Sequence, residues 1–386
     1  MSKPRVLIIG AGFTGVAVAH DLALRGFDVT VVDRGDVITG TSGRTHGLLH
    51  SGGRYCVNDA ESAVECIDEN MILRKIMPQC IEPNGGLFVA LNDSDLAYAE
   101  RFTEAAEACH IPVDELKPEE VLRLEPNVNR QVLVGFMVPD GTFDPLRFAL
   151  AFAATAKANG AHFRLYTEVK SFLMSGSTVT GVHVWDRNTG LEEDIYADVV
   201  VNAGGPWSGR VAAMAGANVP IRPTPGVMVA YDQRFVNRAI NRLNKPGDGD
   251  IVLPQRRMAV VGTTSFEVKD PDYVPVTRDQ VQMMLERGSA LVPAIAQAKM
   301  RGAFMATRPL IDSGGSGRSL SRTFECFDHE QTDGVGGLVT IAGGKATTSR
   351  AMAEKAADVV CQKLGVSTQC VTKEVPLRSY REFYMR

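Results

Sequence analysis

The sequence predicts an α/β protein in which a Rossmann-like domain is assembled from discontinuous segments and an α+β substrate domain, built on a mainly antiparallel sheet, is inserted. Three observations predict this class. Residues 5–33 show a β-α-β pattern, apolar strands end in paired glycines at residues 197–205 and 337–344, and strand-like segments alternate with turns between residues 220 and 266. Continuous apolar runs of strand length are typical of parallel strands covered on both faces. We therefore expect one sheet that draws its strands from the start, middle and end of the chain.

The remaining elements set the expected division of the chain. A strand is expected at residues 85–91, and helical spacing predicts helices near residues 60–77, 96–109, 145–159, 281–291 and 347–364. The nucleotide-binding domain is expected to comprise residues 1–80, 146–215 and 330–377. The substrate domain is expected to comprise residues 81–145 and 216–329. Residues 378–386 are expected to form a frayed C-terminal tail.

Composition limits the function classes. Of the 386 residues, 45% are apolar and 22% are charged, which is typical of a folded globular protein. The 41 basic and 45 acidic residues give a net charge of −4, without the basic excess of a nucleic-acid-binding protein. No apolar stretch reaches the length of a membrane span, about 18 residues, and the seven cysteines contain no CxxC pair. We therefore expect a cytoplasmic protein without metal or iron–sulfur ligands.

The first β-α-β unit carries a nucleotide-binding pattern. Gly10, Gly12 and Gly15 form G-x-G-x-x-G between a strand and a helix, and Asp33 ends the second strand. The first glycine allows a tight turn, the second lets a pyrophosphate approach the backbone, and the third lets helix and strand pack closely. The helix start offers free N–H groups, and the acid can accept hydrogen bonds from ribose hydroxyls. This pattern predicts an adenine dinucleotide but does not separate NAD from FAD.

A loop rich in glycine and hydroxyl groups, residues 39–55, favours FAD. A flavin ring must be covered and hydrogen-bonded along both edges, whereas a nicotinamide has no obvious need of a second such loop. The loop also contains Arg44, Arg54 and the bulky Tyr55, which a solvated linker does not need. A flexible surface loop is the competing interpretation. We predict FAD as the cofactor.

A second candidate for flavin contact lies near the C-terminus. Gly343 and Gly344 end a buried strand, Lys345 follows, and Thr347 and Thr348 begin the expected helix. Free N–H groups and an ammonium there would stabilise negative charge on the pyrimidine edge of a reduced flavin. A plain strand-to-helix turn with an exposed lysine is the alternative.

Taken together, these segments resemble FAD-dependent glycerol-3-phosphate dehydrogenases, and among them the flavin-binding A subunit of the anaerobic enzyme. The resemblance extends from about residue 4 to about residue 365 and rests on residues 39–55, 138–145, 202–207, 245–251, 262–264, 308–310 and 343–345. This family belongs to the D-amino-acid-oxidase-like flavoproteins, which oxidise amines and hydroxy acids. The resemblance implies oxidation of sn-glycerol 3-phosphate, or a similar anionic polyol phosphate, to the ketone by hydride transfer to flavin N5.

The resemblance also implies residue roles. It implies cofactor contacts at Gly10, Gly12, Gly15, Asp33, Thr41, Ser42, Arg44, Val169, Gly204 and Gly205. The turn after residue 343 adds Gly344, Lys345 and Thr347 to this set. Substrate contacts are implied for Arg54, Tyr55, Thr264, Arg308 and Lys345. A phosphomonoester is an anion that guanidinium groups bind bidentately, which agrees with this assignment.

Catalytic roles are expected for His50, Tyr55, Arg308 and Lys345, with His50 or Tyr55 taking the hydroxyl proton. His50 could equally hold its loop by hydrogen bonds alone. His46 lies in the same loop, whereas the remaining histidines are expected to be structural. Asp140 and Asp144 are expected to be cap or turn residues rather than catalysts.

Two departures from the family pattern leave alternatives open. The anaerobic enzyme's flavin chain usually continues into a cysteine-containing iron–sulfur region, whereas this chain ends at Arg386, so the electron acceptor can be a quinone, oxygen or a partner subunit. Peripheral association with the inner face of a membrane through a partner also stays open. Ala346 and Ser349 stand where larger residues are common, so the substrate can differ. The alternatives are oxidation of a 2-hydroxy acid, amino acid or aminophosphonate, or a flavin subunit that needs partner chains.

Overall fold

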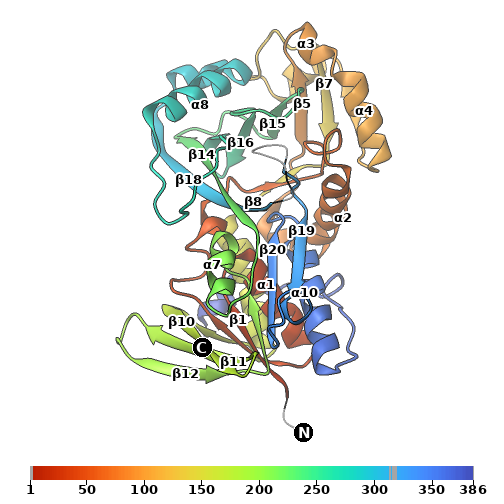
Figure 1. The fold of residues 1–386 in the computed structure, drawn as a ribbon. Helices are drawn as coiled ribbons and strands as arrows, with labels where there is room; N and C mark the ends of the chain where they lie inside the picture. The colour runs from red at the N-terminus through yellow and green to blue at the C-terminus, as the bar shows by residue number, and fades with distance from the viewer. Residues whose placement is uncertain (1–2, 313, 315–319, 386) are drawn as a thin grey trace.

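The computed structural model describes residues 3–312, 314 and 320–385, and within them the chain builds two large β-sheets. One sheet lies in the lower part of Figure 1 and the other in the upper part. The expected α/β class, with a parallel and a mainly antiparallel sheet, is confirmed. None of the described helices is both long enough and apolar enough to cross a membrane.

The lower sheet contains the predicted β-α-β unit of residues 5–33. Its strand order is β19-β20-β13-β1-β2-β9, with bounds β19 Phe324–Asp328, β20 Leu338–Gly343, β13 Val199–Asn202, β1 Arg5–Ile9, β2 Asp28–Val32 and β9 His162–Arg164. All neighbours pair in parallel except β19 and β20, which are antiparallel. This pairing brings β19 into the lower sheet, across the boundary expected at residue 330. β2, the next strand along the chain, pairs with one edge of β1, and β13, from a distant segment, pairs with the other edge. The carboxyl ends of β1 and β13 therefore border a crevice of the kind that binds ligands in such sheets.

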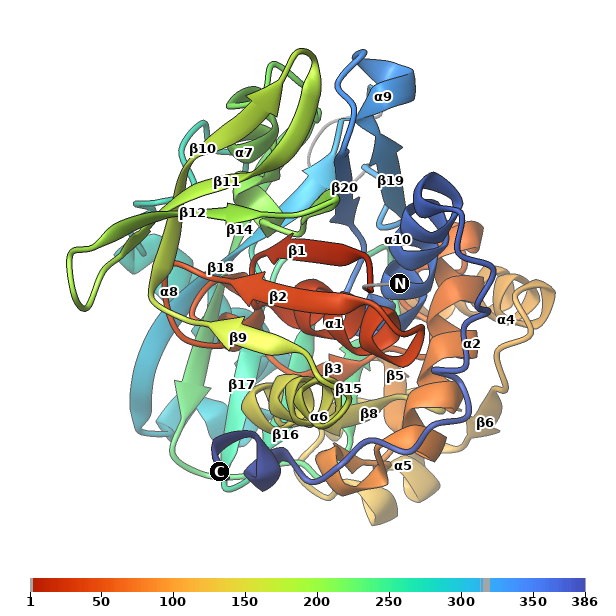
Figure 2. The same ribbon diagram turned by 90° about the horizontal axis from the view of Figure 1, so that it is seen from below.

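Both faces of this sheet are covered, which explains its continuous apolar strands (Figure 2). The covering elements are α1 (Phe13–Leu24), α6 (Pro145–Ala158) and α10 (Ser349–Leu364) on one face, and the antiparallel layer β10 (Thr167–Ser175), β11 (Thr178–Asp186) and β12 (Glu192–Tyr196) on the other. Within β1, Val6 and Ile8 pack against the helices, whereas Leu7 and Ile9 pack against the β-layer. Burial of each such side chain contributes about 1.5–3 kcal/mol.

The upper sheet contains eight described strands, in the order β18-β14-β17-β16-β15-β5-β7-β6. Their bounds are β18 Met300–Ile311, β14 Ile221–Tyr231, β17 Met258–Gly262, β16 Ile251–Gln255, β15 Ala239–Arg242, β5 Gly86–Ala90, β7 Val134–Val138 and β6 Asp114–Leu116. Only β15 and β5 pair in parallel among these described neighbours. A small third sheet joins β3 (Leu48–Leu49), β8 (Gly141–Phe143) and β4 (Ile81–Glu82).

Helices pack on both sides of the upper sheet. α8 (Arg278–Leu291) and α5 (Pro118–Leu124) contribute to one apolar cluster, and α2 (Ala60–Ile76) and α4 (Ala99–Ala108) contribute to another around β5 and β7. The helix expected at residues 96–109 is divided: a separate short helix, α3 (Asp93–Leu96), is capped by the Asn92 side chain, which accepts a hydrogen bond from the Asp95 N–H, and α4 begins only at Ala99.

Two further expectations need correction. α10 begins at Ser349 rather than at Thr347, because the preceding residues form a turn in which the Lys345 N–H donates to Thr348 Oγ1. The expected frayed tail is folded over its described residues: η6 (Tyr380–Tyr384) packs on α6, with Phe383 buried. The Lys157 ammonium donates to the Phe383 carbonyl at 2.8 Å, and the Arg378 N–H donates to Thr155 Oγ1 at 2.9 Å.

Candidate active site

A cleft of about 1370 Å³ lies between the two large sheets. Strand ends of the lower sheet form one wall, and β14, β18 and their loops form the other. Pockets for small ligands usually enclose about 300–1,000 Å³. The cleft therefore has room for a dinucleotide and a small substrate together.

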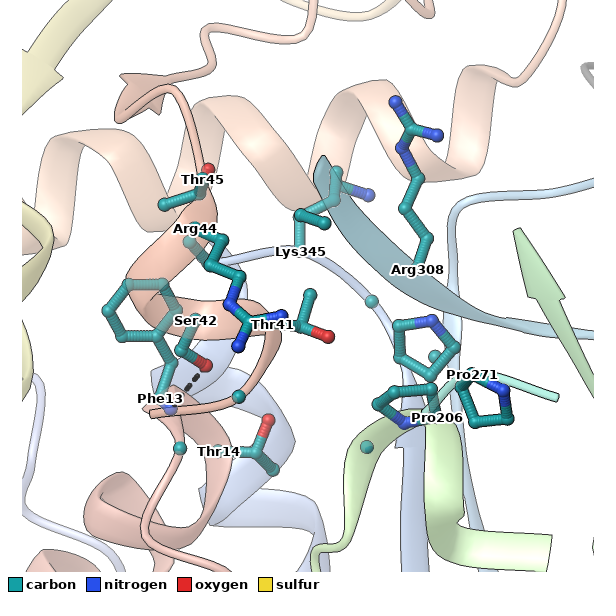
Figure 3. A pocket seen from close by; sticks show the side chains of 18 of the residues that line it. Phe13, Thr14, Thr41, Ser42, Arg44, Thr45, Pro206, Pro271, Arg308 and Lys345 are labelled. Atoms are coloured by element: carbon teal, nitrogen blue, oxygen red, sulfur yellow. Dashed lines mark hydrogen bonds between the residues drawn. The ribbon is translucent and has the colours of Figure 1, made fainter. Parts of the chain in front are cut away.

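The lower wall is shaped by the glycine turn between β1 and α1. Gly10 has a φ of +110°, which favours glycine, and a Cβ on Gly15 would lie 1.8 Å from the Gly10 carbonyl oxygen. A Cβ on Gly12 would lie 3.0 Å from Ser42 Oγ. The Phe13 N–H donates to the same Ser42 Oγ at 3.0 Å, which ties the turn to the loop that follows β2 (Figure 3). Gly10 and Gly12 line the cleft, and the turn presents backbone there because these residues carry no side chain.

Asp33, at the end of β2, also lies in this wall. Its carboxylate accepts hydrogen bonds from the Ala11 N–H at 2.7 Å and from the Gly35 N–H at 2.8 Å. Burial raises the pKa of Asp33, and these two N–H groups oppose that rise. Each oxygen keeps a further lone pair, so the carboxylate can still accept hydrogen bonds from a ligand.

The loop of residues 39–55 crosses from the lower wall to the upper wall. Its short helix η1 (Thr41–Arg44) is fixed by Thr41, whose hydroxyl donates to the Thr307 carbonyl in β18 at 2.7 Å. Figure 3 shows Ser42, Arg44 and Thr45 on one side of the cleft and Arg308 on the other. The stretch is therefore tied to both walls, as expected, and is not a free surface loop.

His50 is buried in the middle of this loop, and its backbone is held from two sides. Its N–H donates to Thr347 Oγ1 at 3.1 Å, and its carbonyl accepts from the Asn70 side chain at 3.1 Å. The next residue, Ser51, donates its N–H to Asp140 Oδ1 at 2.7 Å. Asp140 therefore supports the loop from a buried position and is not the turn residue that was expected, whereas Asp144 does cap α6.

The ring of His50 faces Tyr55, with 3.4 Å between His50 Nε2 and the Tyr55 hydroxyl. Burial lowers the pKa of His50 well below its usual range, and the positive charges nearby, among them Lys345 and Arg54, lower it further. Burial raises the pKa of Tyr55 to about 12. At neutral pH the imidazole is therefore uncharged and the phenol keeps its proton, and the tautomer of His50 sets which of the two groups donates.

Two guanidinium groups reach the cleft from distant segments. Arg54 donates to the Gly247 carbonyl at 3.2 Å and lies 3.7 Å from the Asp250 carboxylate. Arg308, in β18, contacts the carbonyl oxygens of Thr224 at 3.3 Å and Thr264 at 3.4 Å, and the Thr263 hydroxyl. Desolvation lowers the pKa of the half-buried His46, and both guanidinium groups lower it further, so both act on one part of the cleft.

Lys345 follows β20 and lines the cleft. Gly344 before it has a φ of +66°, which lets the chain turn sharply out of the strand. The Lys345 ammonium donates to Ser62 Oγ at 2.6 Å and to the Arg322 carbonyl at 2.8 Å, and it lies 5.2 Å from the centre of the Tyr55 ring. His50, Tyr55 and Lys345 thus form one group of neighbours.

Most of the predicted site residues line the cleft: Gly10, Gly12, Asp33, Thr41, Ser42, Arg44, His50, Arg54, Tyr55, Val169, Gly204, Gly205, Arg308, Gly344 and Lys345. Three others lie behind its surface. Gly15 packs against Gly10, Thr264 accepts the Val227 N–H with its hydroxyl, and Thr347 accepts the His50 N–H.

A strap over the cleft was not predicted from the sequence. Residues 263–277 leave β17, and Asp272 within them accepts hydrogen bonds from Trp207 Nε1 at 2.7 Å, Arg210 at 2.6 Å and Arg34 at 3.2 Å. Arg34 also stacks on the Trp207 ring at 4.4 Å. The strap joins the upper sheet to the lower half of the molecule at the rim of the cleft. Its sequence signal is weak, because Asp272 stands among prolines and charges that resemble any surface loop.

The residues present fit a flavin dinucleotide. The glycine turn is a cradle that Cβ atoms would fill, the helix behind it offers free N–H groups, and Asp33 stands at the end of the second strand. The cleft continues beyond this cradle to His50, Arg54 and Arg308, where a second molecule can meet the ring of a bound flavin.

Comparisons with known proteins agree with this fit. The model of the FAD dependent oxidoreductase family matches residues 5–359. The A1 subunit of the anaerobic glycerol-3-phosphate dehydrogenase of Haloferax volcanii is 42% identical, over 99% of this chain and 67% of the relative. The A subunit of the anaerobic glycerol-3-phosphate dehydrogenase of Escherichia coli K12 is 41% identical, over 98% of this chain and 70% of the relative.

Solved structures show the same architecture. The glycerol-3-phosphate dehydrogenase from Bacillus halodurans, complexed with FAD, superposes with a TM-score of 0.77 at 26% identity, covering 97% of this chain and 68% of that chain. This chain belongs to the FAD dependent oxidoreductase family. It is a flavoprotein whose cofactor is FAD, and the resemblance seen in its sequence is confirmed.

Proposed function

We propose that this member of the FAD dependent oxidoreductase family oxidises the secondary alcohol of sn-glycerol 3-phosphate, or of a similar anionic polyol phosphate, to the ketone. One observation carries the proposal: Arg54, Arg308 and Lys345 line the same cleft as the nucleotide-binding turn. Three cationic side chains at one end of a flavin cleft suit a small substrate that carries a dianionic group. The identity to relatives named as glycerol-3-phosphate dehydrogenase subunits supports this choice of anion.

The lower half of the molecule is proposed as the FAD-binding domain and the upper half as the substrate domain. When bound, FAD supplies the hydride acceptor at its N5 atom. Gly10, Gly12 and the start of α1 would hold the pyrophosphate, and Asp33 would hold the ribose. Val169 would meet the adenine. The remaining proposed contacts are Gly15, Thr41, Ser42, Arg44, Gly204, Gly205, Gly344, Lys345 and Thr347.

Arg54 and Arg308 are proposed to clamp the phosphate. Arg308 is held by threonine oxygens on β14 and on the strap, so its guanidinium is oriented before the substrate arrives. Thr264 contributes indirectly, because its carbonyl is one of these oxygens. Such preorganisation lowers the entropy lost on binding and fixes the carbinol carbon relative to the ring.

His50 is proposed as the base that takes the hydroxyl proton. Its imidazole is uncharged at neutral pH, whereas Tyr55, with its pKa raised to about 12 by burial, keeps its own proton and does not serve as the base. The cations that hold the pKa of His50 low include Lys345 and Arg54, which are the groups that a bound phosphate would neutralise. Substrate binding should therefore raise the basicity of His50 at the moment when it is needed.

The electron acceptor is proposed to be reached through a partner chain, with a quinone or oxygen as alternatives. The support is that the relatives are named as subunits of an anaerobic enzyme. Peripheral association with the inner face of a membrane would come through that partner. Copurification of the tagged chain from detergent-solubilised membranes, compared with the wash fraction, tests both statements; a chain found alone in the wash contradicts them.

The decisive experiment is reduction of the flavin without oxygen. Glycerol 3-phosphate added to the purified yellow protein should bleach the flavin absorbance in a single turnover. A panel of 2-hydroxy acids, amino acids and aminophosphonates serves as the comparison. Bleaching by one of these and not by glycerol 3-phosphate would reassign the substrate, while the absence of bleaching by any of them would favour a flavin subunit that needs partner chains.

A further inference from the structure

Lys345 contacts a carboxyl group that does not itself line the cleft. Its ammonium lies 3.8 Å from Glu65 Oε2 in α2, beside its shorter hydrogen bonds to Ser62 and Arg322. Glu65 Oε2 is buried and has no hydrogen-bond partner among the described residues. The Lys345 side chain is 9% exposed and that of Glu65 is 21% exposed. The Glu65 carboxyl therefore touches the cleft lysine at one end and retains access to solvent.

The pKa of Glu65 lies near neutral pH. Burial raises the pKa of Glu65 to about 7, and Lys345 opposes that rise. The other groups that face it are carboxylates of the same helix region, Asp59, Glu61 and Glu69, which raise its pKa further. The neighbouring Cys66 has its thiol pKa raised to about 12 by burial, so it adds no charge near pH 7.

We propose that Glu65 is a positioning residue that sets the charge presented to an anion in the cleft: protonated Glu65 leaves the Lys345 ammonium uncompensated, and ionised Glu65 neutralises it. The inference rests on the proposed function in that it takes the substrate to be an anion bound beside Lys345. Glu65 would regulate that site from outside the cleft, and it would act only through Lys345.

The direction of the effect follows from the charges. Below about pH 7 the Lys345–Glu65 pair carries a charge of +1, and above it the pair is neutral. Anion affinity should therefore fall as the pH rises through 7. Linkage requires the reverse effect as well, so a bound anion raises the pKa of Glu65 and the protein takes up protons as it binds.

Sulfate is the probe, because its charge does not change between pH 5.5 and pH 8.5, unlike that of a phosphomonoester. Calorimetric titration of sodium sulfate into the flavin-loaded protein should show an affinity that falls about tenfold across this range. Glu65→Gln, which keeps the shape and removes the charge, should abolish this pH dependence. Asp68→Asn, at an exposed position of the same helix, is the matched control and should keep it.

A second measurement needs no variant and so does not depend on how Glu65→Gln folds. Sulfate binding at pH 7.5, repeated in buffers of different ionisation enthalpy, should report uptake of about half a proton if binding shifts the pKa of Glu65 by about one unit. Absence of proton uptake, a pH dependence that survives in Glu65→Gln, or a cleft that binds no sulfate overturns the inference.

These outcomes are separable from failure of the proposed function. Sulfate that binds with the expected pH dependence to a protein whose flavin is not bleached by glycerol 3-phosphate would contradict the proposed substrate alone. Bleaching by glycerol 3-phosphate together with pH-independent sulfate binding would contradict the role of Glu65 alone.

Discussion

The two walls of the cleft are built in different ways. The lower wall presents backbone atoms from short segments, and it works because Gly10, Gly12 and Gly15 have no side chain. The upper wall presents charged side chains, and Arg54 and Arg308 come from positions 254 residues apart in the chain. One wall therefore depends on shape and the other on charge.

We therefore expect the two walls to control different properties of the protein. Changes in shape at the lower wall should affect retention of the flavin, whereas changes in charge at the upper wall should affect turnover of a protein that still holds its flavin. Substitutions in each wall can separate the two properties, and the largest effect is expected in the glycine turn.

Gly15→Ala should remove the flavin. The new Cβ would lie 1.8 Å from the Gly10 carbonyl oxygen, so β1 and α1 must move apart. We expect loss of bound FAD and destabilisation by several kcal/mol, at least the about 1–3 kcal/mol typical of overpacking. The ratio of flavin to protein absorbance and the melting temperature measure this. Gly302→Ala is the control, because a Cβ there meets nothing within 4 Å; equal behaviour of the two variants would contradict the role of the turn.

Arg308→Ala should leave the flavin in place and remove turnover. Loss of one clamp on a buried anion costs about 2–5 kcal/mol, which is about 30-fold or more in kcat/KM. Flavin content and steady-state rates with a dye acceptor measure the two effects separately. Arg301→Ala, an exposed position of the same strand, should change neither. Full activity in Arg308→Ala would place the anion elsewhere in the cleft.

His20 offers a test of the lower half alone, through acid stability. It is buried in α1, neither ring nitrogen has a hydrogen-bond partner in the described part of the chain, and burial lowers its pKa to about 4. An unfolded chain protonates histidine near pH 6.5. Because the pKa of His20 is lower in the folded state, only the unfolded chain takes up the proton between pH 6.5 and pH 4. The stability that the neutral His20 contributes is therefore present above pH 6.5 and is lost as the pH falls toward 4.

At pH 5 this loss amounts to about 2 kcal/mol. His20→Leu should therefore show a smaller difference in the free energy of unfolding between pH 7.5 and pH 5, by about that amount. Urea unfolding at the two pH values measures it, with His162→Gln at an exposed position as the control. An unchanged difference would mean that other groups govern the acid sensitivity of this half.

The smallest effect is expected at the strap that joins the two walls. Asp272→Asn weakens three hydrogen bonds from the lower half, but the carboxylate is 44% exposed, so we expect about 1 kcal/mol and a release of flavin about fivefold faster. The rise of flavin fluorescence after dilution measures the rate. Asp270→Asn, which contacts Arg210 alone among these donors, should have a smaller effect. Equal rates in parent and Asp272→Asn would show that the strap does not retain the cofactor.

The lower wall was predicted from the sequence more completely than the upper wall. The turn of residues 10–15, the acid at Asp33 and the parallel strands are local patterns whose spacing has one structural solution. For the upper wall, family resemblance identified Arg54 and Arg308 as substrate contacts, but reasoning from residues alone left their neighbours open. The sequence pattern predicts a turn at Asp140 and does not single out Asp272 or Glu65 at all, because an isolated acid on a loop or helix carries no periodic signal.

What the sequence by itself determined is therefore the class of fold, the nucleotide turn and the flavin, since each leaves a pattern among residues that are close in the chain. Only the tertiary structure decided that the Tyr55 hydroxyl faces His50 Nε2, that Thr264 and Thr347 act from behind the cleft surface, and that Lys345 meets Glu65 across 280 positions of sequence. The physical reason is that burial and long-range packing set the charge of these groups. A residue's pKa and partners depend on its surroundings in space, and the order of residues does not give these surroundings directly.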